Sequence, residues 1–214
     1  MRLFLTSHDL GNYKEELLKL VTGSKALLIS NARDYYPPEK RFSDIKEKIG
    51  ILTAAGFDVE ELDLKDYFGK PDSLRARIDS FAPNLIFAVG GNTFLLSTAF
   101  YLSGFDKILK EDLTKDKYVY GGNSAGAMVT VKTLRFYGHD HLSPEAVKDI
   151  YGVDAVLDGL NLIDGYIIAH ADVPKHLETT KMYVKRIEDA GEKPIILNQT
   201  GAYIVNGDNV ILYD

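Results

Sequence analysis

The stretch DKYVYGGNSAGAMVTV, residues 116–131, decides how the chain folds. Its apolar run at 118–120 predicts a β-strand, which is followed by two glycines and then by Asn123 and Ser124. The small residues after the serine favour a tightly packed helix. A strand that passes into a helix through a glycine-rich turn is typical of α/β proteins, so this stretch predicts that class.

The same alternation of strand and helix patterns continues on both sides of the turn. Strands are predicted at 2–6, 25–30, 57–62, 84–89, 118–120, 165–169 and 194–197, and helices at 12–21, 37–55, 71–81, 93–102, 105–113 and 174–190. Several strands are apolar on both faces, which indicates a mostly parallel sheet with helices on both sides. Residues 135–160 read as a loop, and Asn206-Gly207 predicts a hairpin turn. We expect a single domain over 1–214.

Composition and charge exclude several classes of function. The chain of 214 residues has no cysteine, so disulfides, thiolate zinc sites and a cysteine nucleophile are excluded. Its 25 Lys and Arg are scattered among 31 acidic residues, giving a net charge of −6, so we expect no nucleic-acid partner. No apolar run is long enough to span a bilayer, and the stretch MRLFLTSHDLGNYKEELL lacks the long apolar segment typical of a secretory signal. A cytoplasmic protein with no membrane contact is expected.

Gly122, Ser124 and Gly126 match the G-x-S-x-G pattern of a nucleophile elbow. A serine on such a turn is raised above the sheet edge, and glycine is favoured two residues before and after it because larger side chains would collide with neighbouring backbone. The following helix would start beneath the serine, and the N–H of Ala125 would be one donor to an oxyanion. The alternative is a glycine-rich turn of any α/β fold that cradles a phosphate.

A second glycine turn lies upstream, in NLIFAVGGNTFLL, residues 84–96. The strand ends at Gly90-Gly91, and Asn92 can cap the next helix. Parallel strands that end in such turns place their loops at the same carboxyl edge, where α/β folds build sites. The Gly91 amide is therefore a candidate for the second oxyanion donor, and ordinary helix capping is the alternative.

A serine nucleophile needs a base. His170 follows the apparent strand at 165–169 and is expected at the same carboxyl edge, whereas His139 and His141 flank Asp140 in a polar loop. His8 lies near the end of the first strand. The segment HADVPKH, residues 170–176, also invites a metal interpretation, but a zinc site needs three or four converging ligands, and we expect no metal here.

The motifs VGGNTFLL, YVYGGNSAGAMV, GLNLID with IAHAD, and PIILNQTGAYIVNG resemble peptidase family S51, over about residues 1–210. That family includes aspartyl dipeptidases (peptidase E) and cyanophycinases. The resemblance implies a fold like that of class I glutamine amidotransferases, cleavage of small aspartyl peptides, and no cofactor. It also implies that Ser124 is the nucleophile and His170 the general base, with Gly91 and Ala125 as oxyanion donors.

The sequence departs from the family at two points. The acidic third member of the family's triad should follow the strand at 194–197, where LNQTGAY places Gln199. An amide can orient imidazole but carries no charge, and replacing a triad carboxylate by an amide can lower turnover by about 10⁴-fold. Asp172 is an alternative partner of His170. In the helix after His170, PKHLETTKMYVKR, no arginine is placed as the basic residue expected to bind an aspartyl side chain. The candidates for that role are Lys132, Arg135, Lys175 and Lys181.

The predicted function is a serine peptidase that hydrolyses short peptides, with N-terminal aspartyl dipeptides as the implied substrates. The predicted catalytic set is Ser124, His170 and Gln199, and Asn92 and Asn123 are expected to contact the substrate. A second hypothesis is an attenuated relative that binds a small acidic ligand or partner at the same edge. A third, an α/β-hydrolase esterase, fits the elbow but not the order of the partner residues. The oligomeric state is left open.

Overall fold

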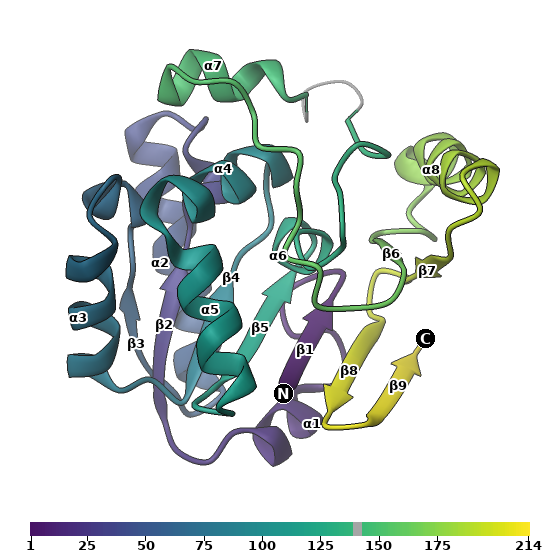
Figure 1. The fold of residues 1–214 in the computed structure, drawn as a ribbon. Coiled ribbons are helices and arrows are strands. Elements are labelled where there is room, and N and C mark those ends of the chain that lie inside the picture. Colours follow the sequence, from purple (N-terminus) through teal and green to yellow (C-terminus); the bar gives the residue numbers. More distant parts are fainter. Residues whose placement is uncertain (139–142) are drawn as a thin grey trace.

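A mostly parallel seven-stranded sheet forms the centre of the computed structural model, which describes residues 1–138 and 143–214 (Figure 1). Its strands are β1 (Arg2–Thr6), β2 (Lys25–Ile29), β3 (Asp58–Glu61), β4 (Leu85–Ala88), β5 (Val119–Asn123), β8 (Ala202–Asn206) and β9 (Asn209–Tyr213). They lie in the order β3-β2-β4-β5-β1-β8-β9, with β1 to β5 parallel and the β8–β9 hairpin antiparallel. The predicted α/β class is confirmed.

Helices cover both faces of this sheet. They are α1 (Lys14–Leu20), α2 (Pro38–Ala54), α3 (Pro71–Phe81), α4 (Thr93–Ser103), α5 (Phe105–Thr114), α6 (Ala125–Met128), α7 (Glu145–Tyr151) and α8 (Leu177–Asp189), with 3₁₀ turns η1 (Asn31–Arg33), η2 (Leu64–Tyr67) and η4 (Pro174–His176). Alternate strand residues separate two cores: Leu3 and Leu5 pack with α3, α4 and α5, and Phe4 packs with α1 and α2. In Figure 1, α5 lies in front of the sheet and α3 lies at the left-hand edge of the view.

Three features differ from the sequence-based expectation. The strands β6 (Tyr166–Ile168) and β7 (Pro194–Ile196) pair with each other as a separate two-stranded parallel sheet. The segment expected to be a loop contains helix α7, which ends at Gly152 with φ of 71°. The helix expected at 174–190 begins as a 3₁₀ turn and becomes α-helical only from Leu177. All three differences fall in short segments whose hydrophobic periodicity is mixed. Such a periodicity does not distinguish between helix, strand and loop.

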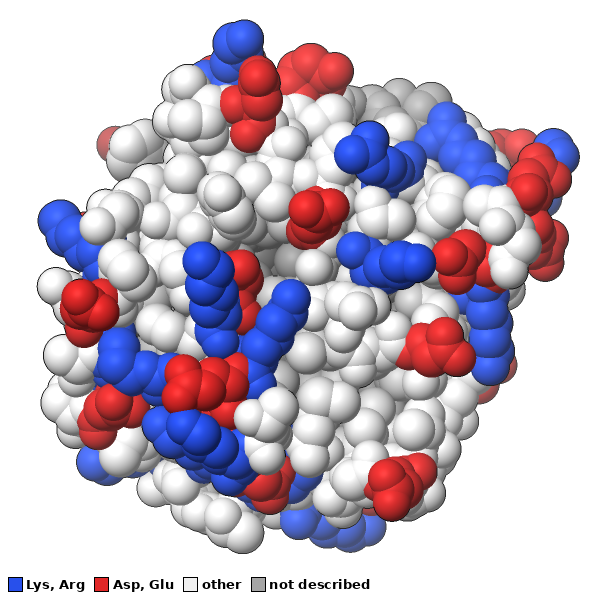
Figure 2. Space-filling model, viewed as in Figure 1, with Lys and Arg blue, Asp and Glu red and all other residues white. Residues whose placement is uncertain are grey.

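The surface carries charges of both signs. On the face in Figure 2, Lys and Arg side chains lie among Asp and Glu side chains rather than in one continuous basic patch. Among the residues that the structure describes, no helix is long and apolar enough to cross a membrane.

Candidate active site

Ser124 sits at a strained turn between β5 and α6. Its backbone has φ of 50° and ψ of −110°, a conformation that non-glycine residues seldom adopt and that is often found at functional sites. A Cβ on Gly122 would lie 2.5 Å from the carbonyl of Gly126, and a Cβ on Gly126 would lie 2.1 Å from the oxygen of Ala88. Both glycines are therefore required by close backbone approach, for the reason expected from the pattern.

The helix after the serine is short. α6 is a single turn of four residues, Ala125–Met128, and the chain then continues through turns. So short a helix has little macrodipole, and the expected support of an oxyanion depends mainly on its N-terminal amides. The N–H of Ala125 makes no hydrogen bond within residues 1–138 and 143–214, so this amide itself remains as a donor.

His170 follows β6 and faces Ser124. Its Nε2 lies 3.0 Å from Ser124 Oγ. The residue has φ of 61°, and its N–H donates to the Oγ of Ser7, which is fully buried and itself donates to the carbonyl of Leu197. Ser7 thereby ties the strained backbone of His170 to the segment that follows β7.

The second ring nitrogen of His170 contacts Gln199. The distance from Nδ1 to the side-chain oxygen of Gln199 is 2.6 Å. That oxygen can only accept, so Nδ1 carries the proton in the neutral ring and Nε2 is left to accept from the Ser124 hydroxyl. Asp172 does not take this position: its Oδ1 accepts the backbone N–H of Gln199 at 2.6 Å. The acid expected as an alternative partner of the ring instead holds the residue that contacts the ring.

Burial lowers the pKa of His170 below its usual value of 6.5. The hydrogen bond with Gln199 and the charge of Asp172 raise this pKa, whereas His8 and Lys175 lower it further, and burial is the largest effect. The ring is consequently neutral at pH 7, as a proton acceptor must be.

The Gly90-Gly91 turn lies beside the serine. A Cβ on Gly90 would be 2.9 Å from the Cβ of Ser124, and a Cβ on Gly91, which has φ of 151°, would be 2.3 Å from the oxygen of Ala32. The side-chain oxygen of Asn123 accepts the N–H of Gly90 at 3.1 Å, so this asparagine joins the two glycine turns.

Asn92 is buried, and its side-chain oxygen accepts the N–H groups of Phe94 and Leu95 at 2.9 and 3.1 Å. It therefore caps α4 and does not line the cavity above the serine, whereas Asn123 does. The arrangement gives Asn92 a structural task in place of the expected contact with a substrate.

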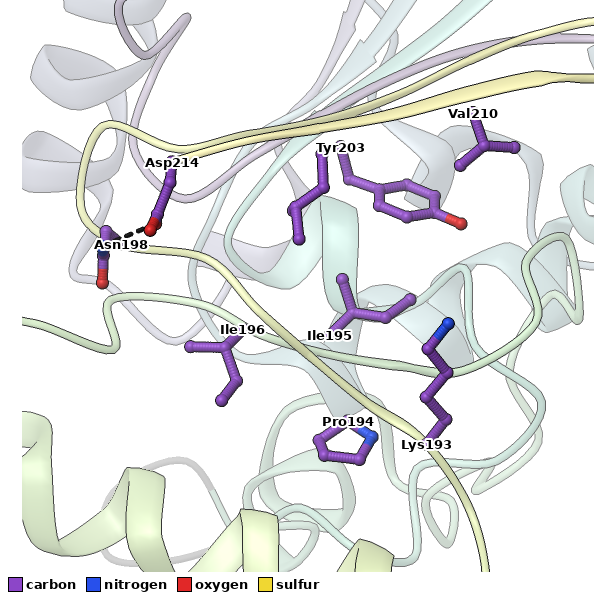
Figure 3. A pocket seen from close by; sticks show the side chains of 9 residues that line it. Lys193, Pro194, Ile195, Ile196, Asn198, Tyr203, Val210 and Asp214 are labelled. Carbon is purple, nitrogen blue, oxygen red and sulfur yellow. Dashed lines mark hydrogen bonds between the residues drawn. The ribbon is translucent and has the colours of Figure 1, made fainter.

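Ser124, His170 and Gln199 line one cavity of about 580 Å³ with Gly91 and Asn123. Of the four basic residues considered from sequence, only Lys175 lines it, and Arg33 and Lys48, which were not considered, also do. A groove of about 660 Å³ between β7 and β9 is a separate feature (Figure 3). Its lining is mixed, with apolar side chains (Ile195, Ile196, Val210 and Leu212) beside polar ones (Lys193, Asn198 and Asp214). It holds none of the candidate catalytic side chains.

The histidines around His170 do not form a metal centre in the described part of the chain, where no group of three or more His, Cys, Asp or Glu side chains converges. The ring of His8 is 6.5 Å from that of His170, and the ring of His176 is 5.6 Å from it. His139, Asp140 and His141 lie outside the described residues.

The residues near the site that were missed from the sequence include Ser7, Arg33 and Lys48. Ser7 and Arg33 follow β1 and β2, at the same carboxyl edge as the glycine turns. The signal that marks them is a polar residue just after a buried parallel strand. It is usable only when the strand order is known, because that order brings the loops after β1, β2, β4 and β5 together.

Comparison with known proteins identifies the family. The family model described as peptidase family S51 matches residues 9–213. The chain belongs to peptidase family S51. It is 30% identical over 161 residues to the uncharacterized peptidase Lmo0363 of Listeria monocytogenes, covering 75% of this chain and 73% of that protein. It is 27% identical to the uncharacterized peptidase Lin0382 of Listeria innocua, covering 98% and 94%.

Solved structures share the fold. A Listeria monocytogenes EGD-e protein, assigned provisionally to peptidase E, superposes with a TM-score of 0.75 at 23% identity, covering 99% of this chain and 96% of that one. A peptidase from an acI-B1 Actinobacterium gives a TM-score of 0.69 at 16% identity, covering 100% and 87%. At these identities the likeness establishes the α/β fold.

Proposed function

We propose that the protein is a serine peptidase of short peptides, in which Ser124 is the nucleophile and His170 the general base. The observation that carries this proposal is the pair of contacts on the imidazole, 3.0 Å from Nε2 to Ser124 Oγ and 2.6 Å from Nδ1 to Gln199. Nucleophile, base and orienting group are all within hydrogen-bond reach, which is the geometry that nucleophilic catalysis requires.

In the first step the Ser124 Oγ bonds to the scissile carbonyl carbon while its proton passes to Nε2 of His170. The carbonyl electron pair moves onto oxygen, where the N–H groups of Gly91 and Ala125 would donate to it. The imidazolium then gives its proton to the leaving amine as the C–N bond breaks. Water repeats the sequence on the acyl-enzyme, which releases the acid and regenerates the serine.

Gln199 acts as an orienting group without charge. Because its oxygen accepts from Nδ1–H, it fixes the productive tautomer of His170 but offers no negative charge to the imidazolium. The charge nearest to that role is Asp172, whose carboxylate binds the backbone of Gln199 and raises the pKa of the ring. Turnover is expected to be lower than with a carboxylate in the same place.

We further propose N-terminal aspartyl dipeptides as the first substrates to test. Support comes from the cations that line the cavity, since a substrate carboxylate prefers a site of positive potential. Arg33 and Lys48 already pair with acidic side chains. Lys175 has no ion pair among the residues that the structure describes, so its ammonium is the best candidate for a substrate carboxylate.

The test is hydrolysis of a panel of dipeptides whose N-terminal residue is Asp, Asn, Glu, Ala or Lys. Cleavage is measured by the release of the free amine. Wild-type protein should cleave at least one member, and Ser124→Ala should lower kcat by at least about 10²-fold, since triad effects are not additive and roughly this factor remains for the serine when the charge of the third member is already absent. Lys175→Met should raise KM for the Asp peptide and leave the Ala peptide unchanged, with Lys181→Met, on an exposed part of α8, as the matched control. Cleavage that survives in Ser124→Ala would refute the proposal.

The second candidate is an attenuated relative that binds a small acidic ligand in the same cavity. The uncharged Gln199 is the specific observation in its favour. It predicts binding of an aspartyl dipeptide by calorimetry with no cleavage by the wild type, and cleavage after Gln199→Glu. Wild-type turnover of the same peptide would exclude it.

A further inference from the structure

The N–H of Gly91 stands out among the backbone donors of its turn. The N–H groups on either side of it are both bonded, that of Gly90 to Asn123 at 3.1 Å and that of Asn92 to the carbonyl of Ala32 at 2.7 Å. The Gly91 N–H has no acceptor within residues 1–138 and 143–214. Gly91 is partly exposed and lines the cavity beside the strained serine, so its unpaired N–H is open to a ligand oxygen.

One side chain fixes the direction of this donor. The Nε–H of Arg33 donates to the carbonyl oxygen of Gly90 at 2.8 Å. The bond between Gly90 and Gly91 is trans, so the carbonyl of Gly90 and the N–H of Gly91 point in opposite directions across one rigid plane. A side chain that holds the carbonyl therefore also sets where the N–H points.

Arg33 is itself held in place. Its guanidinium pairs with Asp44 of α2 and lies 5.8 Å from the centre of the Tyr36 ring, and the side chain is only 12% exposed. Its backbone belongs to η1, the same turn whose Ala32 carbonyl binds Asn92. The turn thus holds the Gly90-Gly91 peptide from both ends. A Gly-Gly segment has no side chains of its own to limit rotation, so without these contacts many peptide orientations are accessible.

We infer that Arg33 is a positioning residue that orients the Gly90–Gly91 peptide so that the Gly91 N–H faces the oxyanion formed by attack of Ser124. The inference rests on the proposed function and deepens it. Arg33 acts through the peptide and not on the substrate, so its loss weakens binding of the tetrahedral intermediate and leaves binding of the intact peptide unchanged.

The test compares Arg33→Met/Asp44→Asn with Asp44→Asn alone. The single variant keeps the guanidinium and its bond to Gly90, and the double variant removes that bond without leaving an unpaired carboxylate. The substrate is the best peptide of the panel, and the probe of the intermediate is the aldehyde of its acyl part, which forms a hemiacetal with the serine. Relative to Asp44→Asn, the double variant should lose about 10- to 10²-fold in kcat with KM within about threefold, since full loss of one oxyanion donor costs about 10²–10³-fold. Affinity for the aldehyde should fall by the same factor.

Each other outcome is decisive. An unchanged kcat in the double variant overturns the inference. A rise in KM confined to acidic peptides, with kcat unchanged, also overturns it, because it would make Arg33 a contact of the substrate. If the double variant does not fold, Arg33→Lys keeps a cation beside Asp44 without the Nε–H, and the same loss of kcat and aldehyde affinity is required of it. A wild type that neither cleaves the panel nor binds the aldehyde refutes the proposed function itself.

Discussion

The side-chain oxygen of Gln199 lies 2.6 Å from Nδ1 of His170, where triads of this kind carry a carboxylate. The contact supplies orientation without charge. Asp172 adds a charge one step further away, through the backbone N–H of Gln199. In the mechanism that we propose, Gln199 orients the imidazole and Asp172 supplies the negative charge, two tasks that a single acidic residue performs in other triads.

Gln199→Glu should increase peptide hydrolysis. A carboxylate of the same length would stabilise the imidazolium, and the gain in kcat should be at least about 10-fold, with about 10⁴-fold as its upper bound. Gln199→Ala should lower kcat, because Nδ1 loses its acceptor and the productive tautomer is no longer fixed. Steady-state kinetics of the three proteins on one peptide check this order, and a Glu variant no faster than wild type would contradict it.

The pH profile should report His170. Burial lowers its pKa below 6.5, and catalysis needs the neutral ring, so kcat/KM should stay constant on acidification down to a pH below 6.5 and then fall. In Gln199→Glu the added negative charge favours the imidazolium, which raises the pKa and moves the acidic limb to higher pH. Rate measurements from pH 4.5 to 8.5 on both proteins test the direction of the shift. An acidic limb in the same place for both would contradict it.

Asp172 should have two separable effects: its charge raises the pKa of His170, and its hydrogen bond holds Gln199 in position. Asp172→Asn keeps an acceptor for the N–H of Gln199 and removes the charge, so the pKa of His170 should fall with little change in the maximal rate. Asp172→Ala removes both, and its maximal kcat should drop by about 10-fold, the value of one hydrogen bond to a charged group. Asp189→Ala is the matched control, because in the described part of the chain the only ion-pair partner of Asp189 is Lys185, also on exposed α8. Equal maximal rates for Asp172→Ala and the control would refute this role.

The glycines of the elbow should be intolerant of a methyl group. Gly126→Ala would place its Cβ 2.1 Å from the oxygen of Ala88, and the backbone shift should lower the free energy of unfolding by about 3 kcal/mol. Gly50→Ala is the control: it lies in the exposed part of α2 with no atom within 4 Å of the added Cβ, and it should raise that free energy by about 0.5–1 kcal/mol. Urea unfolding of both variants measures the difference. If Gly126→Ala unfolds with the same free energy as the wild type, the close packing at this glycine is contradicted.

Local patterns were sufficient for much of the fold and for part of the site. Alternating strand and helix periodicity predicted the parallel sheet, and G-x-S-x-G predicted the strained serine because the need for glycine is local. The pairing of β6 with β7 could not be predicted, since it depends on contacts between distant segments. For the same reason Arg33 and Ser7 were missed: each acts on a residue that the strand order alone brings near, Gly90 and His170 respectively.

Reaction with a fluorophosphonate tests the central claim most directly, because it needs no known substrate. Intact-mass and peptide mass spectrometry of the wild type and of His170→Ala, at equal reagent and time, give the extent and position of labelling. The account predicts one label on Ser124 in the wild type and a large loss of labelling rate in His170→Ala. Wild-type protein that stays unlabelled, or that labels at Ser124 equally fast without the imidazole, would contradict it.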